Sequence, residues 1–303
     1  HYRSGGFFIQ RARQLPGQTP LLDVLLGVVA SSDEPIAGGR HKVFGSLPLQ
    51  IPPQTSTIAS HLPKAVGAAF AIERMARLGL KSEGPRDSLV ICSFGDASSN
   101  HSTACGAFNT ASLADYQRLP CPVLFLCEDN GLGISVRTPR GWVAERFQSH
   151  ANLAYFHADG LDIGAVFEAA SQATEYIRTT RRPAFLHLSL VRLLGHAGSD
   201  VEQLYRTKNE IESTEALDPV LRTGQELIAG GWLSQEDCIA IYEDARARIR
   251  GLAEEATRRP KITTSDQVIE PLAPFDPDAV DAEARRSPPA EARREFFTRL
   301  PEE

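Results

Sequence analysis

The chain of 303 residues has no long hydrophobic run and no concentration of basic charge. Its longest apolar stretches, such as residues 65–72, are far shorter than the roughly 20 residues that a membrane-spanning helix needs. Acidic residues number 38 against 32 lysines and arginines, and they leave no basic stripe. These absences exclude a nucleic-acid platform and a cationic membrane anchor, so we expect neither a nucleic acid nor a membrane as a partner.

Cysteine and methionine are scarce. The five cysteines form no Cys-x-x-Cys pair and lie mostly in apolar runs. This usage predicts buried free thiols in a reducing compartment. We therefore favour a bacterial cytoplasm, with the mitochondrial matrix as an alternative. The chain begins at His1 and holds one methionine, Met75, so we expect it to start inside a longer protein, and a targeting peptide could precede it.

Apolar runs of strand length alternate with helical segments in the middle of the chain. Hydrophobic residues make up 42% of the sequence, which excludes a wholly disordered chain. The predicted strands are residues 89–94, 123–127, 155–158 and 184–190, and the predicted helices are residues 21–30, 65–72, 102–112 and 163–179. This alternation is typical of a mostly parallel sheet with helices on both faces, so the predicted fold class is α/β, doubly wound.

The chain changes character twice towards its C-terminus. We predict that residues 1–215 form the α/β domain, with a Gly- and Pro-rich loop at 35–53. Residues 216–260 supply C-terminal helices to the same domain, at 220–229 and 234–257. Residues 261–303 are rich in Pro, Asp, Glu and Arg, which predicts an extended tail or linker.

The chain lacks the GxxxxGK[ST] phosphate loop, the HExxH zinc helix and the GxSxG nucleophile elbow. It has polar residues at predicted strand ends instead. Asp96 follows one strand and Asn130 follows the next. Ligands of open parallel sheets bind at such ends, Mg²⁺ prefers oxygen ligands, and a helix N-terminus after Asp96 would bind an anion. The residues alone therefore indicate a site for a magnesium diphosphate.

The segments around these two residues carry a family resemblance. GDAS at 95–98 followed by CEDNG at 127–131 is similar to the GDG…NN motif that binds thiamine diphosphate. Further matching segments are PQTSTIA at 53–59, LPKAVGAA at 62–69 and GHAGSD at 195–200. Over residues 1 to about 260 the chain resembles the α subunit of the E1 component of 2-oxo acid dehydrogenase complexes, with the branched-chain type favoured.

The resemblance implies a role for each matching residue. Mg²⁺ would be bound by the side chains of Asp96 and Asn130 and by the backbone carbonyl of Leu132. His196 would be catalytic, handling a proton or orienting the substrate carboxylate. The residues implied in binding the cofactor are Tyr2, Arg3, Ser56, Ile58, Gly95, Asp96, Ala97, Ser98, Asn130 and His196.

Each candidate also has a plain structural interpretation. Asp96 could cap a helix, Asn130 could be an ordinary turn residue, and His196 could be a loop histidine bonded to backbone. For His101, which matches no family ligand, we prefer the structural interpretation. Residues 114–118 look like an insertion that lengthens a helix or loop.

Two departures from the family pattern bear on the cofactor. Ala97 stands at the third glycine of the motif, where its methyl group could crowd the cofactor, and Asp129 replaces the first asparagine. Ala197 stands where regulated relatives carry a phosphorylatable serine. The glutamate that activates the aminopyrimidine ring has no match here, and in the family it comes from the β subunit.

The implied function is thiamine-diphosphate-dependent decarboxylation of a 2-oxo acid, with transfer of the acyl group to a lipoyl group. The implied partners are an E1 β subunit or a fused β-like region, a second copy of the chain in an α2β2-like assembly, and a lipoyl-bearing E2. The alternatives are an acetoin- or pyruvate-type E1 α subunit, and a non-catalytic subunit whose cofactor site has decayed.

Overall fold

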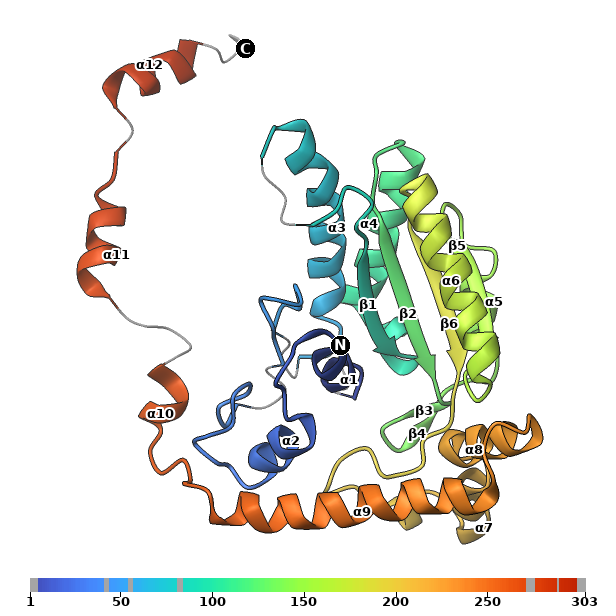
Figure 1. Ribbon diagram of the computed structural model, residues 1–303. Coiled ribbons are helices and arrows are strands. Elements are labelled where there is room, and N and C mark those ends of the chain that lie inside the picture. The colour runs from blue at the N-terminus through green and yellow to red at the C-terminus, as the bar shows by residue number, and fades with distance from the viewer. Residues whose placement is uncertain are drawn as a thin grey trace.

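Four parallel strands form the central sheet of the computed structural model, which describes residues 5–40, 44–53, 57–80, 84–270, 276–287 and 289–298. They are β1 (Val90–Gly95), β2 (Val123–Asp129), β5 (Ala154–Asp159) and β6 (Ala184–Ser189), in the order β1-β2-β6-β5. A short hairpin of β3 (Leu132–Gly133) and β4 (Val136–Arg137) follows β2 (Figure 1). Every predicted strand is present within a few residues of its expected bounds.

Helices cover both faces of the sheet, so the predicted α/β class is confirmed. One face packs against α3 (His61–Arg77), α4 (Ser102–Tyr116) and α5 (Trp142–Phe147). The other packs against α6 (Ile163–Thr180). Small residues spaced along the inner sides of α4 and α6 are fully or nearly fully buried, which brings these helices close to their neighbours. Helix α4 continues to Tyr116, so it includes the first residues of the segment 114–118.

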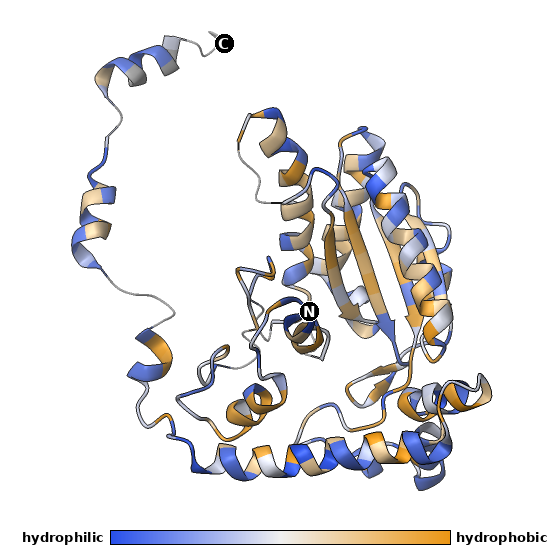
Figure 2. Cartoon of the chain, in the orientation of Figure 1, coloured by the Kyte–Doolittle hydropathy of each residue, from blue (hydrophilic) through white to orange (hydrophobic). Residues whose placement is uncertain are grey.

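Residues alternate between the two sides along each strand. On β2, Phe125 and Cys127 belong to the core on the α3–α4 side, whereas Leu124 belongs to the core beneath α6. Because helices cover both faces of the sheet, the side chains on both sides of the strands are mostly hydrophobic (Figure 2).

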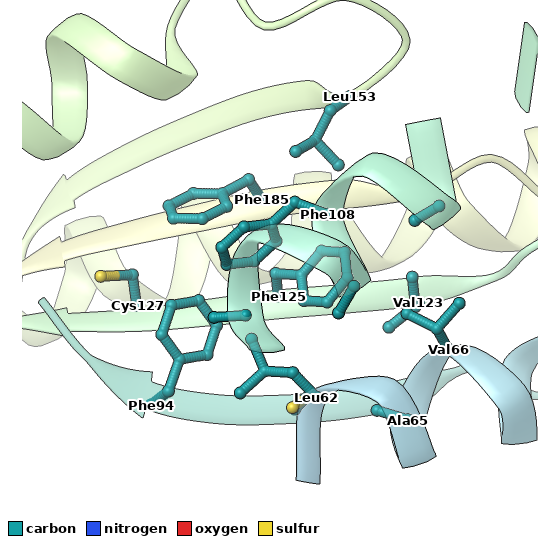
Figure 3. Packing of buried hydrophobic residues seen from close by; sticks show 14 of the residues in the cluster. Leu62, Ala65, Val66, Phe94, Phe108, Val123, Phe125, Cys127, Leu153 and Phe185 are labelled. Atoms are coloured by element: carbon teal, nitrogen blue, oxygen red, sulfur yellow. The ribbon is translucent and has the colours of Figure 1, made fainter. Parts of the chain in front are cut away.

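Aromatic packing dominates the larger core (Figure 3). Phe108 of α4 lies at its centre, with its ring centroid 4.9 Å from those of Phe125 and Phe147. The ring of Phe147 stacks on Phe185 at 4.0 Å. Edge-to-face and offset contacts of this kind add about 0.5–1.5 kcal/mol per pair beyond the burial of apolar area.

A further group of described elements lies near the C-terminal ends of the strands (Figure 1). They are α1 (Gly5–Gln14), α2 (Pro20–Val28), α7 (Lys208–Glu215), α8 (Pro219–Ala229) and α9 (Gln235–Arg258), with the 3-10 turns η1 (Ala97–Asn100) and η2 (Glu202–Leu204). Helix α9 contacts α2, and Ser31 pairs with Lys261 just beyond the end of α9. No helix in the described ranges is long and apolar enough to cross a membrane.

The sequence did not predict several short elements. Helices α1, α5 and α7 and the β3–β4 hairpin were missed. The hairpin and α5 are too short to show a period, α1 begins with two glycines, and α7 buries no residue that would mark an apolar face. The predicted extended tail holds three short helices, α10 (Asp266–Ile269), α11 (Pro277–Ala284) and α12 (Ala290–Thr298). They run away from the sheet (Figure 1). The predicted domain limits remain a prediction.

All five cysteines are free thiols. Cys92, Cys121 and Cys127 are buried, as the apolar runs around them predicted. Burial raises the pKa of Cys92 to about 12 and that of Cys121 to about 11. Because the thiolate is the reactive form, these thiols act as packing groups.

Replacing Phe108 tests the aromatic core. Phe108→Ala removes a fully buried ring and should lower the free energy of unfolding by about 3–5 kcal/mol, measured by urea denaturation. Phe167→Ala is the matched control, since the side chain of Phe167 is 75% exposed on α6. An equal loss of unfolding free energy in both variants would contradict the packing of Phe108 in the aromatic core.

Candidate functional site

The two candidate metal-binding side chains lie at the same edge of the sheet. Parallel pairing of β1 with β2 places Gly95 opposite Glu128. Asp96 and Asn130, which follow these strands, therefore leave the sheet at neighbouring strand ends. The edge is the carboxyl end of the strands, where open parallel sheets bind ligands (Figure 1).

Asp96 is a buried carboxylate, with only 1% of the residue exposed. Its Oδ2 accepts a hydrogen bond of 2.6 Å from the hydroxyl of Thr138. Burial raises the pKa of Asp96, and the nearby negative charge of Asp129 raises it further, while the bond from Thr138 opposes both effects. The site thus holds two interacting carboxyl groups.

The residues after β2 form two consecutive turns in which a side-chain oxygen accepts a backbone N–H two residues ahead. Oδ1 of Asp129 accepts from the N–H of Gly131 at 3.1 Å, and Oδ1 of Asn130 accepts from the N–H of Leu132 at 3.1 Å. Gly131 has a φ of +74°, a conformation that favours glycine. We call residues 129–132 the Asx turn.

Thr138 connects the Asx turn to Asp96. Its backbone N–H donates to the carbonyl of Gly131 at 3.0 Å, while its hydroxyl donates to Asp96. The β3–β4 hairpin supplies this residue by folding the chain back over the turn. The sequence does not predict a role for Thr138, because nothing in its local sequence relates it to a carboxylate 42 residues away.

Ala97 packs against the same hairpin. A Cβ atom built on Gly133 would lie only 2.8 Å from the Cβ of Ala97. The methyl group of Ala97 thus lies beside Gly133, while the residue itself is exposed. The absence of a side chain at Gly133 makes room for it.

Asp129 is also held from the sheet side. Its Oδ2 accepts a bond of 2.9 Å from Nε2 of His187, a buried residue on β6. Burial alone would raise the pKa of Asp129, but the bonds from His187 and from the N–H of Gly131 outweigh it and lower that pKa. His187 was not among the residues that the sequence predicted for this site. The available signal was the period of two along β6, which puts position 187 on the same face as Phe185.

The loop after β6 carries His196, a half-buried residue. Its backbone N–H donates to Oδ2 of Asp200 at 2.6 Å, and the hydroxyl of Tyr205 donates to the same oxygen at 2.7 Å. These bonds, together with the positive charge of Arg192, hold the pKa of Asp200 below its usual range. Arg192 also donates to the carbonyl of Ile134 at 2.7 Å, which ties the loop to the β3–β4 hairpin.

The other predicted site residues are distributed around this edge and beyond the described part of the chain. Gly95 ends β1, Ser98 is half-buried in η1, and Ile58 is 39% exposed just before α3. Tyr2, Arg3 and Ser56 lie outside the described residues. His101 acts as a helix cap, since its Nδ1 accepts from the N–H of Thr103 at 3.2 Å.

The oxygen groups at this edge are of mixed kinds. The predicted metal ligands are one carboxylate, one amide oxygen and one backbone carbonyl, from Asp96, Asn130 and Leu132. Among the residues that the structure describes, no group of three or more His, Cys, Asp or Glu side chains is placed to hold a metal ion. The described side chains at this edge therefore do not form an all-acidic cage.

Known proteins share this combination of sequence and fold. The chain matches the family model "Dehydrogenase E1 component" over residues 2–265. It is 29% identical over 212 residues to the mitochondrial 2-oxoisovalerate dehydrogenase subunit alpha of Pan troglodytes, covering 68% of this chain and 44% of that protein. It is 30% identical over 210 residues to the probable mitochondrial pyruvate dehydrogenase E1 component subunit alpha of Caenorhabditis elegans, covering 69% and 50% respectively.

The chain spans about half the length of the curated relatives that it matches. The family model covers much more than half of the chain itself. The relatives named above are α subunits of both the branched-chain and the pyruvate type. The chain therefore belongs to the dehydrogenase E1 component family, as an α-type component.

Proposed function

We propose that this chain is the α component of an E1 enzyme that decarboxylates a 2-oxo acid with thiamine diphosphate and Mg²⁺ and passes the acyl group to a lipoyl group on E2. The observation that carries the proposal is the pairing of β1 with β2. It sets the buried carboxylate of Asp96 beside the Asx turn in a chain of the E1 family. The site residues of the sequence analysis are part of this proposal.

The donor groups fit a magnesium diphosphate. Mg²⁺ takes oxygen ligands and keeps open positions for phosphate oxygens. Asp96, Asn130 and Leu132 would hold it. Burial, and to a lesser extent the charge of Asp129, raises the pKa of Asp96. A divalent cation here would stabilise the buried carboxylate and offset its repulsion with Asp129. Thiamine diphosphate, when bound, supplies the electron sink for decarboxylation.

His196 would hold or move a proton at its ring during the reaction. Its loop is fixed at Asp200 and tied by Arg192 to the hairpin that also carries Thr138. The loop and the diphosphate end of the site therefore share one scaffold. A general acid or base held in this way contributes about 10²- to 10⁴-fold to turnover.

The substrate type follows from the relatives by analogy. The branched-chain type is our first choice, supported by the 2-oxoisovalerate dehydrogenase relatives of several mammals. A pyruvate-type or acetoin-type E1 is the second. A decayed site is less well supported, because Ala97 packs on Gly133 and Asp129 keeps its bond within the turn. We place the protein in a bacterial cytoplasm, although the relatives are named as mitochondrial.

The assembly is also part of the proposal. We expect an E1 β subunit, or a fused β-like region, to complete the cofactor site, and a second copy of the chain to give an α2β2-like particle. An apolar hollow of about 640 Å³ between α3 and α4 supports close packing against another chain. Its lining includes Gly67 and Gly106, where an added Cβ would meet nothing within 4 Å.

Removing the carboxylate of Asp96 tests the metal site. Asp96→Ala should abolish Mg²⁺-dependent binding of thiamine diphosphate, measured by calorimetry on the assembled protein, because the only proposed charged ligand is lost. Asp159→Ala is the matched control, since Asp159 also ends a strand at this edge but has a half-exposed side chain paired with Arg222. Binding of thiamine diphosphate by Asp96→Ala at wild-type affinity would show that Asp96 is not a metal ligand.

Replacing His196 tests the chemistry. His196→Ala should lower turnover in the assembled complex by about 10²-fold or more, with a smaller effect on cofactor affinity. Ser199→Ala, an exposed position in the same loop, is the control and should retain turnover. Equal turnover in wild type and His196→Ala would return His196 to a structural role.

Assaying the chain without a β-type partner tests whether the cofactor site is shared between two chains. The chain alone should show negligible release of CO₂ from 2-oxo acids, because no residue of its sequence matches the family's glutamate for the aminopyrimidine ring. Addition of a β-type chain should restore release. Full decarboxylation by monodisperse residues 1–303 alone would refute the division.

A further inference from the structure

Three polar side chains on one face of the sheet form a hydrogen-bond chain that ends at the Asx turn. The hydroxyl of Tyr155 on β5 lies 2.7 Å from Nδ1 of His187 on β6. Nε2 of His187 lies 2.9 Å from Oδ2 of Asp129 at the end of β2. His187 is 4% exposed and shares its face with the rings of the larger core, where a buried polar group requires partners.

The direction of this chain follows from the groups involved. A carboxylate only accepts hydrogen bonds, so Nε2 of His187 carries the hydrogen that it shares with Asp129. In the neutral ring Nδ1 is then an acceptor, and the hydroxyl of Tyr155 donates to it. Burial raises the pKa of Tyr155 to about 12, which keeps this hydroxyl protonated. Every polar atom between Tyr155 and Asp129 thus has a partner.

Both oxygens of Asp129 are engaged in structure. Oδ2 accepts from His187, and Oδ1 accepts from the N–H of Gly131. The Asp129 carboxylate is therefore held by β6 on one side and by the turn itself on the other, which suits it to orient the turn. The residues whose orientation depends on that turn are Asn130 and Leu132, the second of which is bonded to the first.

We propose that Tyr155, His187 and Asp129 are positioning residues that fix the Asx turn and so orient Asn130 and Leu132 towards the metal diphosphate. The orienting role rests on the proposed function, whereas the hold on the turn can be tested without any cofactor. Groups of this kind behind metal ligands typically change metal affinity by about 10- to 100-fold when they are removed.

The neighbouring His157 provides a matched control. It faces His187 across β5 and β6, with ring centroids 5.0 Å apart. Its Nε2 instead pairs with the hydroxyl of Ser189 at 3.0 Å, and it is exposed. The two histidines share a sheet position and differ in whether they reach the Asx turn.

The experiment compares His187→Phe, Tyr155→Phe and His157→Phe in the assembled protein. Calorimetry measures the affinity for thiamine diphosphate with Mg²⁺, and hydrogen exchange measures the amides of Gly131 and Leu132 without cofactor. We expect about 10- to 100-fold weaker binding and faster exchange in His187→Phe. Tyr155→Phe, which removes a single oxygen atom, should give a smaller change in the same direction. His157→Phe should match wild type in both measurements.

A conservative pair separates positioning from general loss of stability. Asp129→Ala removes both bonds and should behave like His187→Phe. Asp129→Asn should lose much less affinity, because an amide can still accept from Gly131 and can donate to the other tautomer of His187. Equal losses in Asp129→Asn and Asp129→Ala would overturn the positioning role.

Three further outcomes also decide between the proposal and its alternatives. Unchanged affinity and unchanged exchange in His187→Phe would overturn the proposal. If His187→Phe does not fold, unchanged values in Tyr155→Phe and in Asp129→Ala would do the same. If the wild-type protein binds no thiamine diphosphate, the proposed function fails. Exchange at Gly131 and Leu132 then decides on its own whether the hydrogen-bond chain holds the turn.

Discussion

The parallel pairing of β1 with β2 is the constraint on which the site depends. It sets the ends of two strands side by side, although the residues that follow them, Asp96 and Asn130, are far apart in the sequence. The aromatic core around Phe108 packs against both strands from one face, and α6 packs on β2 from the other. Burial of hydrophobic surface thus determines where the polar groups of the site meet.

A hydrogen-bonded scaffold then keeps a buried charge in place. The carboxylate of Asp96 is desolvated and lies near the carboxylate of Asp129, which is unfavourable unless other groups compensate. Thr138 donates to Asp96, and His187 donates to Asp129. Each carboxylate is therefore supported by a donor from a different segment, the hairpin in one case and β6 in the other.

The departures from the family motif are accommodated locally. The methyl group of Ala97 fits because position 133 is a glycine, and a larger residue there would collide with it. The charge of Asp129 fits because a histidine at position 187 donates to it. Gly133 and His187 are both distant in the sequence from the residues that they accommodate, Ala97 and Asp129. The residues of the motif alone therefore do not determine whether the site is intact.

Much of this architecture could be predicted from the sequence. The strands and the longer helices have strong apolar patterns, and Asp96 and Asn130 stand where polar residues end such patterns. The short helices and the β3–β4 hairpin could not be predicted, because they are held by tertiary contacts and not by a local period.

The sequence by itself determined which strands exist and which polar residues follow them, since both depend on the order of apolar and polar side chains along the chain. Only the tertiary structure decided that Thr138 bonds to Asp96 and that Tyr155 and His187 support Asp129. These bonds join residues 32 to 58 positions apart. Such contacts exist only after the strands have paired, because a hydrogen bond needs its two atoms within about 3 Å and in line.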